Sequence, residues 1–177
     1  FGHDLINPTV NATVKMLSSY SPDAILTVDE DGWLSVLGSA LDLSGTDVSI
    51  WPIVPNMPRV VREVADNGVI GSQIRRFMKL GVRSQMTLLL RIFNKIPKLA
   101  RNDFVTGILM LVDMEMTHFK RRKVDSIVLS NQITELALTF QNRRLFTEFI
   151  DVVRCRYGAS AGFMTSNLRL LVTQLTV

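Results

Sequence analysis

The chain has 177 residues, of which 47% are apolar, and its formal net charge is +4. This length suits a single domain, and the composition, with ten glycines and six prolines, excludes a disordered, collagenous or low-complexity chain. One cysteine excludes a disulfide framework and predicts a reducing compartment, the cytoplasm or the nucleus. The mean hydropathy of +0.22 is high for a chain of this size, so we expect part of its surface to be covered by a partner or a second copy.

The charge is unevenly distributed along the chain. Residues 1–58 carry one lysine against seven acidic residues, a net of −6, whereas residues 59–177 carry 19 basic residues against nine acidic ones, a net of +10. We therefore expect a single domain over 1–177 with an acidic helical part (1–45), a proline-rich connector (46–58) and a basic helical part (59–177). The start at Phe1 rather than Met is typical of a piece of a longer protein.

Most of the chain has the apolar period of helices. The first expected helix begins at Pro8, with Asn7 at its N-cap position, and ends near Tyr20. A long helix from Asp103 to about Phe119 is apolar nearly all round, which predicts a central, buried position. The remaining helices are expected at about 33–44, 56–67, 72–81, 84–96, 124–140, 145–157 and 164–175.

Residues 24–41 allow two interpretations. One is a hairpin that joins 24–28 to 33–37. The other is a helix, which we favour because the apolar residues from position 33 onwards recur at helical spacing, with Asp31 as a cap and Gly45 as a stop. The connector that follows contains three prolines, which prevent regular helix, and we expect Trp51 and Ile53 to pack it against the domain. A domain boundary at this point is the alternative.

These patterns predict an all-α protein, an irregular bundle of about seven to ten helices with short loops. HEAT-like or armadillo-like stacking of helix pairs is the alternative, although no residue pattern repeats at a fixed period. The longest strongly apolar run, 104–112, is too short to cross a bilayer, so no transmembrane segment is expected, while contact with a membrane surface stays open.

Residues that could carry chemistry are few. Glu115 and His118 have the spacing of a metal-binding pair on a helix, but the remaining ligands are missing, and we interpret His118 as a structural or surface histidine. Cys155 lies between two arginines without a nearby histidine, which favours a buried, inert thiol. No nucleotide-binding, nucleophile-elbow or zinc motif occurs. We therefore expect no enzyme activity, no catalytic, metal-binding or cofactor-binding residues and no cofactor.

The basic clusters are the strongest signal, because several of them fall at helix ends or in loops and could share one surface. Helix capping and solubility are their simpler explanation. The predicted function is a non-enzymatic interaction or assembly module that self-associates or docks a larger protein through apolar helix faces and an electropositive surface. The alternative is a nucleic-acid-binding protein, such as an RNA-packaging or matrix-like component, with RNA or another polyanion as partner. The expected protein-binding or phosphate-binding residues are Arg75, Arg76, Lys79, Arg83, Lys95, Lys98, Arg101, Lys120, Arg121, Arg122, Lys123, Arg143, Arg144, Arg154 and Arg156.

Overall fold

The structure is a computed structural model, and it describes residues 8–30, 32–62, 103–120 and 122–176. Their centre is a parallel four-stranded sheet with the spatial order β1-β2-β3-β4. The strands are β1 (Ala24–Thr27), β2 (Ser49–Val54), β3 (Ser126–Leu129) and β4 (Ser160–Phe163). The described helices are α1 (Pro8–Tyr20), α2 (Trp33–Ser44), α6 (Phe104–Glu115), α7 (Asn131–Thr139), α8 (Arg143–Val152) and α9 (Leu168–Leu175), with a 3-10 turn η1 (Met116–Phe119), a π-helical turn η2 (Val153–Tyr157) and helical residues at 57–62.

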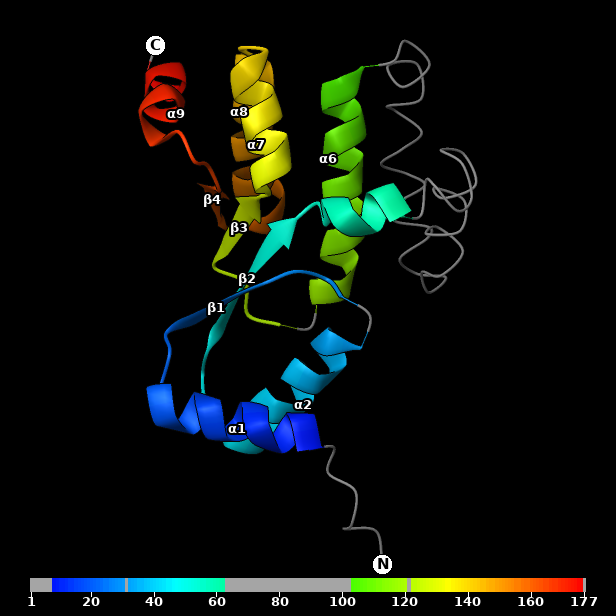
Figure 1. Cartoon of the computed structure of the whole chain (residues 1–177), viewed down its shortest axis with the longest axis vertical. Coiled ribbons are helices and arrows are strands. Elements are labelled where there is room, and N and C mark those ends of the chain that lie inside the picture. The colour runs from blue at the N-terminus through cyan, green and yellow to red at the C-terminus, as the bar shows by residue number, and fades with distance from the viewer. Residues whose placement is uncertain (1–7, 31, 63–102, 121, 177) are drawn as a thin grey trace, which may run out of the picture.

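The predicted all-α fold is therefore wrong, as is its alternative of stacked helix pairs, because helices alternate with a parallel sheet in an α/β arrangement (Figure 1). Strands of a parallel sheet are buried on both faces and form short apolar runs, which periodicity alone cannot distinguish from pieces of a buried helix. The clearest case is 124–140, which was expected as one helix. It contains the whole of β3 and then α7, with Ser130 between them.

The connector at 46–58 contains a strand rather than an irregular linker. Pro52, which would normally exclude a central strand, lies where β2 changes partner. Its register mate on β1 is Thr27, while the ladder with β3 begins only at Ile53. Because few ladder hydrogen bonds are needed at this changeover, a residue without an N–H group is tolerated there.

The helices with the clearest caps agree with the sequence. The expected helix from Pro8 to Tyr20 is confirmed as α1, and the helical interpretation of the stretch after 33 is confirmed as α2, which ends at Gly45 in a left-handed conformation. Residues 24–27, however, form β1, so the hairpin interpretation was correct for its first strand only. Asp31 and the expected helices between 63 and 102 lie outside the described residues.

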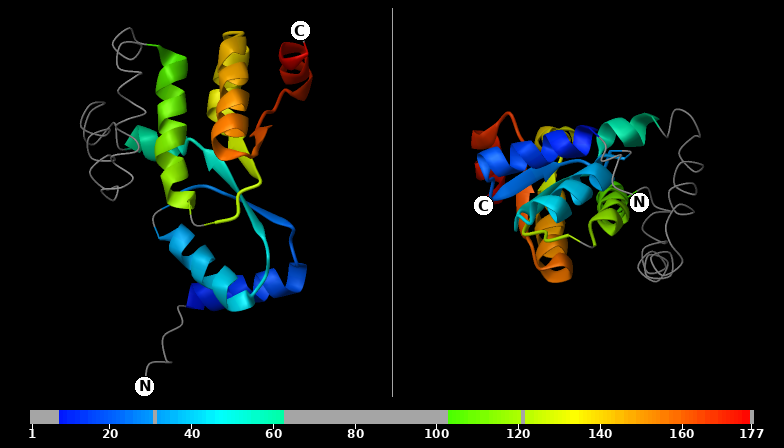
Figure 2. Two further views of the ribbon diagram at one scale, coloured as in Figure 1. Left: turned by 180° about the vertical axis from the view of Figure 1, so that it is seen from behind. Right: turned by 90° about the horizontal axis from the view of Figure 1, so that it is seen from below.

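The core follows the sheet and includes buried residues of α1 and α2 as well as of α6 to α9. Val54, Ile127 and Leu129 are fully buried, and α6 has nine buried residues of twelve, which confirms its expected central position. At β4, the ring of Phe163 packs against Phe146 and Phe149 of α8. Two views show α1 and α2 at one end of the molecule and α6 to α9 at the other (Figures 1 and 2). No helix in the described ranges is both long enough and apolar enough to span a membrane.

Candidate functional site

Polar residues follow all four strands at the carboxyl end of the sheet. Asp29 comes two residues after β1, Asn56 two residues after β2, Ser130 directly after β3 and Thr165 two residues after β4. The carboxyl ends of parallel strands meet at one edge, and α/β proteins bind their ligands there. This edge is therefore where a functional site is expected in this fold.

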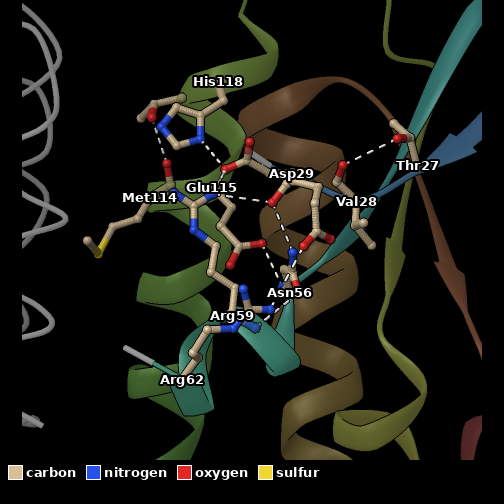
Figure 3. A network of polar contacts seen from close by, with 11 residues as sticks. Thr27, Val28, Asp29, Asn56, Arg59, Arg62, Met114, Glu115 and His118 are labelled. Carbon is tan, nitrogen blue, oxygen red and sulfur yellow. Dashed lines mark hydrogen bonds and ion pairs between the residues drawn. The ribbon is translucent and has the colours of Figure 1, made fainter. Parts of the chain in front are cut away.

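Asp29 is the centre of a polar cluster at the β1 side of this edge (Figure 3). Its residue exposure is 7%, and its Oδ2 lies 2.5 Å from Nδ1 of His118 and 2.5 Å from Nη1 of Arg59. The same Arg59 nitrogen also donates to the main-chain oxygen of Asp29 at 3.2 Å. A buried carboxylate is thus held between an imidazole and a guanidinium group.

Asn56 connects this cluster to α6. Its Nδ2 donates to the main-chain oxygen of Asp29 at 2.9 Å, and its main-chain N–H donates to Oε2 of Glu115 at 2.8 Å. Its Oδ1 also accepts from the main-chain N–H of Arg59 at 3.3 Å, in the helical segment 57–62. The ends of β1 and β2 and the end of α6 are therefore fixed relative to one another by polar contacts.

The surroundings keep Asp29 ionised. Burial by itself raises the pKa of this carboxyl group, but the hydrogen bond and charge of His118, followed by those of Arg59, outweigh it, and the pKa lies below its ordinary value of 3.8. The side chain of His118 is 38% exposed, and within the part of the chain that the structure describes its Nε2 has no partner. A carboxylate on Nδ1 orients the imidazole and favours the tautomer with its proton on that nitrogen, which leaves Nε2 as the atom that can accept a proton.

The β3 side of the edge holds polar atoms without partners. Ser130 is 4% exposed, and neither its Oγ nor Oδ1 of Asn131 makes a hydrogen bond within the described ranges, although both atoms are buried. Glu135, one turn further along α7, is engaged: its Oε1 accepts from Oγ1 of Thr165 at 2.8 Å and from the N–H of Ser166 at 2.6 Å.

Several of the basic residues predicted to bind a partner are engaged within the chain. Arg122 pairs with Asp42 and Lys123 with Asp47, at 3.0 and 2.8 Å. Arg144 pairs with Asp103 and Glu148, while Arg156 pairs with the buried Asp113, which also accepts a hydrogen bond from the hydroxyl of Tyr157 at 2.6 Å. Arg143 and Arg154 are exposed and have no ion pair within the described ranges, Lys120 has contacts of its own, and Arg75, Arg76, Lys79, Arg83, Lys95, Lys98, Arg101 and Arg121 lie outside the described residues.

The described basic clusters are also separated in space. Arg143 begins α8, and Arg154 lies beyond its end in η2, roughly 16 Å away along a helix that rises 1.5 Å per residue. Arg122 and Lys123 lie in a third place, against the loop after α2. The structure therefore does not bring these described clusters together at one point.

The three side chains singled out for chemistry have different outcomes. Cys155 was expected to be buried, but it is exposed, because it lies on the outer side of the π-helical turn. Glu115 and His118 do not converge on a common ligand, since the first contacts Asn56 and the second Asp29. Sequence reasoning missed Asp29, Asn56 and Arg59. The only signal was a polar residue directly after a short apolar run, and it becomes informative once that run is known to be a strand.

Within the described ranges, no group of three His, Cys, Asp or Glu side chains could hold a metal ion. Comparison with known proteins adds no functional assignment. No protein-family model, no curated protein and no solved structure matches this chain.

Proposed function

We propose that this chain binds a small polar molecule at the carboxyl end of its sheet and that His118, oriented by Asp29, acts there as a general base. The observation that carries the proposal is the 2.5 Å contact between Asp29 Oδ2 and Nδ1 of a half-exposed His118 whose Nε2 has no partner among the described residues. A base that must take a proton near neutral pH is most often such an imidazole. The predicted non-enzymatic interaction module remains a second proposal.

An ester-hydrolysis assay tests the proposed base. We expect the chain to hydrolyse p-nitrophenyl acetate above the buffer rate, and we expect His118→Gln to remove this rate. His3→Gln is the matched control, because His3 is the only other histidine of the sequence. Equal rates for the wild type and His118→Gln would rule out an accessible catalytic base at this position.

An interaction or assembly module is the second candidate. Exposed apolar residues of α9 and of the end of α7 favour an interaction module, among them Phe140 at 73%, Leu168 at 67% and Val172 at 48% exposure. Such residues are suited to contacts with another protein or a second copy. Light scattering should then give a mass above that of the monomer, unchanged between low and moderate salt, and Leu168→Asp should return it to one chain.

We also propose that the protein is located in a reducing compartment, the cytoplasm or the nucleus, because it has a single cysteine. A third candidate function is the binding of RNA through the basic clusters. Binding that depends on phosphate contacts falls steeply with salt. The double variant Arg121→Glu, Arg122→Glu should bind RNA more weakly than the wild type at the same salt concentration. An unchanged affinity for RNA in this variant would contradict the RNA proposal.

A further inference from the structure

We propose that the N-terminus of α7 binds a phosphate group, free or as a monoester, through the hydroxyl of Ser130 and the first main-chain N–H groups of the helix. This inference deepens and rests on the proposed function, because it assigns the anionic end of the small polar ligand to the β3 side of the same edge.

Ser130 is the first observation. It occupies the N-cap position of α7, where a serine hydroxyl normally accepts a hydrogen bond from an N–H of the first turn, yet its side chain makes no such bond. The residue is 4% exposed, and its Oγ has no hydrogen-bond partner among the described residues. A buried hydroxyl without a partner is costly, so its presence at this position points to a partner supplied by a ligand.

The backbone of α7 is the second observation. The first intrahelical bond of this nine-residue helix runs from the N–H of Thr134 to the oxygen of Ser130, so the N–H groups of residues 131, 132 and 133 have no helical acceptor. These groups carry the positive end of the helix dipole, and together with a hydroxyl donor they suit a phosphate oxygen.

Asn131 adds an acceptor beside these donors. Its Oδ1 is buried and has no partner, and it can accept a hydrogen bond only from a ligand that carries a proton donor. Phosphate near neutral pH retains an O–H group, and a phosphate monoester of a polyol offers hydroxyl groups. The nearest carboxylate on the helix, Glu135, is directed to Thr165 and Ser166 instead.

The two parts of the edge are closely connected. The N–H of Ser130 donates to the oxygen of Val54 at 2.9 Å, and Asn56, two residues later, is bonded to Asp29. A small molecule with its phosphate at α7 therefore extends across the ends of β3 and β2 toward the Asp29 and His118 pair. The geometry points to a small phosphorylated hydroxy compound as the class of ligand.

The test is a titration of the ¹⁵N-labelled protein with inorganic phosphate, with glycerol phosphate and sulfate as parallel arms. With phosphate, we expect saturable shifts of the amide signals of residues 131–133. Sulfate should bind more weakly than phosphate, because it carries no proton to donate. Glycerol phosphate should bind more tightly than inorganic phosphate if the ligand is an ester. Ser130→Ala should weaken phosphate binding roughly tenfold or more, the loss of one hydrogen bond to a charged group. The thermal stability of Ser130→Ala should not fall, because the hydroxyl of Ser130 has no partner in the described part of the chain.

Ser126→Ala is the matched control. Ser126 is the first residue of β3, the strand that ends just before Ser130. Its hydroxyl donates to the main-chain oxygen of Ser160, away from the carboxyl end of the sheet, so Ser126→Ala should keep phosphate binding. Absence of shifts at 131–133, or equal phosphate affinity in Ser130→Ala, would overturn the inference. Equal affinity for sulfate would contradict the role given to Asn131. Loss of ester hydrolysis in His118→Gln without any phosphate response would reject this inference alone, and the reverse result would reject the proposed base alone.

Discussion

Asp29 shows how one side chain organises a site that belongs to three separate stretches of sequence. A buried carboxylate is stable only when charged or hydrogen-bonding partners replace the water it has lost. Here the partners are Arg59, from the segment after β2, and His118, from the turn after α6. The cluster therefore holds these elements together and also keeps the imidazole in one orientation.

Replacement of Asp29 by Asn should change stability in a pH-dependent way. Because the pKa of Asp29 is lowered on folding, its stabilising contribution is present above about pH 4, near its unfolded pKa of 3.8, and is lost as the pH falls through the lower folded value. We expect Asp29→Asn to cost about 2 kcal/mol near neutral pH and less at the acid end of the range, as the wild-type carboxyl group takes up a proton. Urea unfolding between pH 2.5 and pH 7 measures this difference, and a constant difference over that range would contradict the ion-pair account.

At the level of elements, an ion pair connects the start of α6 to the start of α8. Asp103, at the N-cap position of α6, accepts hydrogen bonds from Arg144 at 2.8 and 3.2 Å and from Thr106 at 2.7 Å. These bonds, that of Arg144 first, lower the pKa of Asp103 to about 2. The contact orients two neighbouring helices although it lies near solvent.

Arg144→Gln should release this carboxyl group. We expect the pKa of Asp103 to rise from about 2 toward 3.8 with little loss of stability, because exposed ion pairs contribute little. A carbonyl-detected NMR titration of the Asp103 side chain measures the pKa. Arg143→Gln is the control, since Arg143 has no ion pair within the described ranges, and an equal rise in that variant would contradict the assignment to Arg144.

Gly38 of α2 allows the guanidinium group of Arg122 to lie against the helix. A Cβ atom at this position would overlap Nη2 of Arg122, which is the end of a flexible side chain that can move away. We expect Gly38→Ala to displace Arg122 from Asp42 while stability stays equal or rises by up to about 1 kcal/mol, because alanine favours helix. Arginine side-chain NMR signals and thermal unfolding test both parts, and a clear loss of stability would show that the Arg122 contact is the larger contribution.

For the whole molecule, stability depends on the core between the sheet and α8. Phe149 is completely buried against Phe163, whereas Phe140, nine residues earlier, is 73% exposed. Phe149→Ala should therefore cost about 3–5 kcal/mol, from lost apolar burial and the cavity left behind. Phe140→Ala should change stability by less than about 0.5 kcal/mol. Urea denaturation of both variants tests this, and equal losses would contradict the described packing.

The sequence by itself determined the helices whose signals are local. Caps and breaks such as Pro8 and Gly45 act on their own neighbours in the chain, and the apolar surface of α6 follows from twelve consecutive residues. The unequal distribution of charge along the chain was equally readable. These features needed no knowledge of what lies beside them in space.

Only the tertiary structure decided the sheet and the site. The four strands are four to six residues long, and each becomes a strand because a distant segment pairs with it, as Val54 pairs with Leu129 across 75 positions. The same holds for Asp29, whose ionised state depends on a histidine 89 positions away. Hydrogen-bond ladders and ion pairs of this kind join segments that the sequence separates, so their energies have no signature in any short stretch of it.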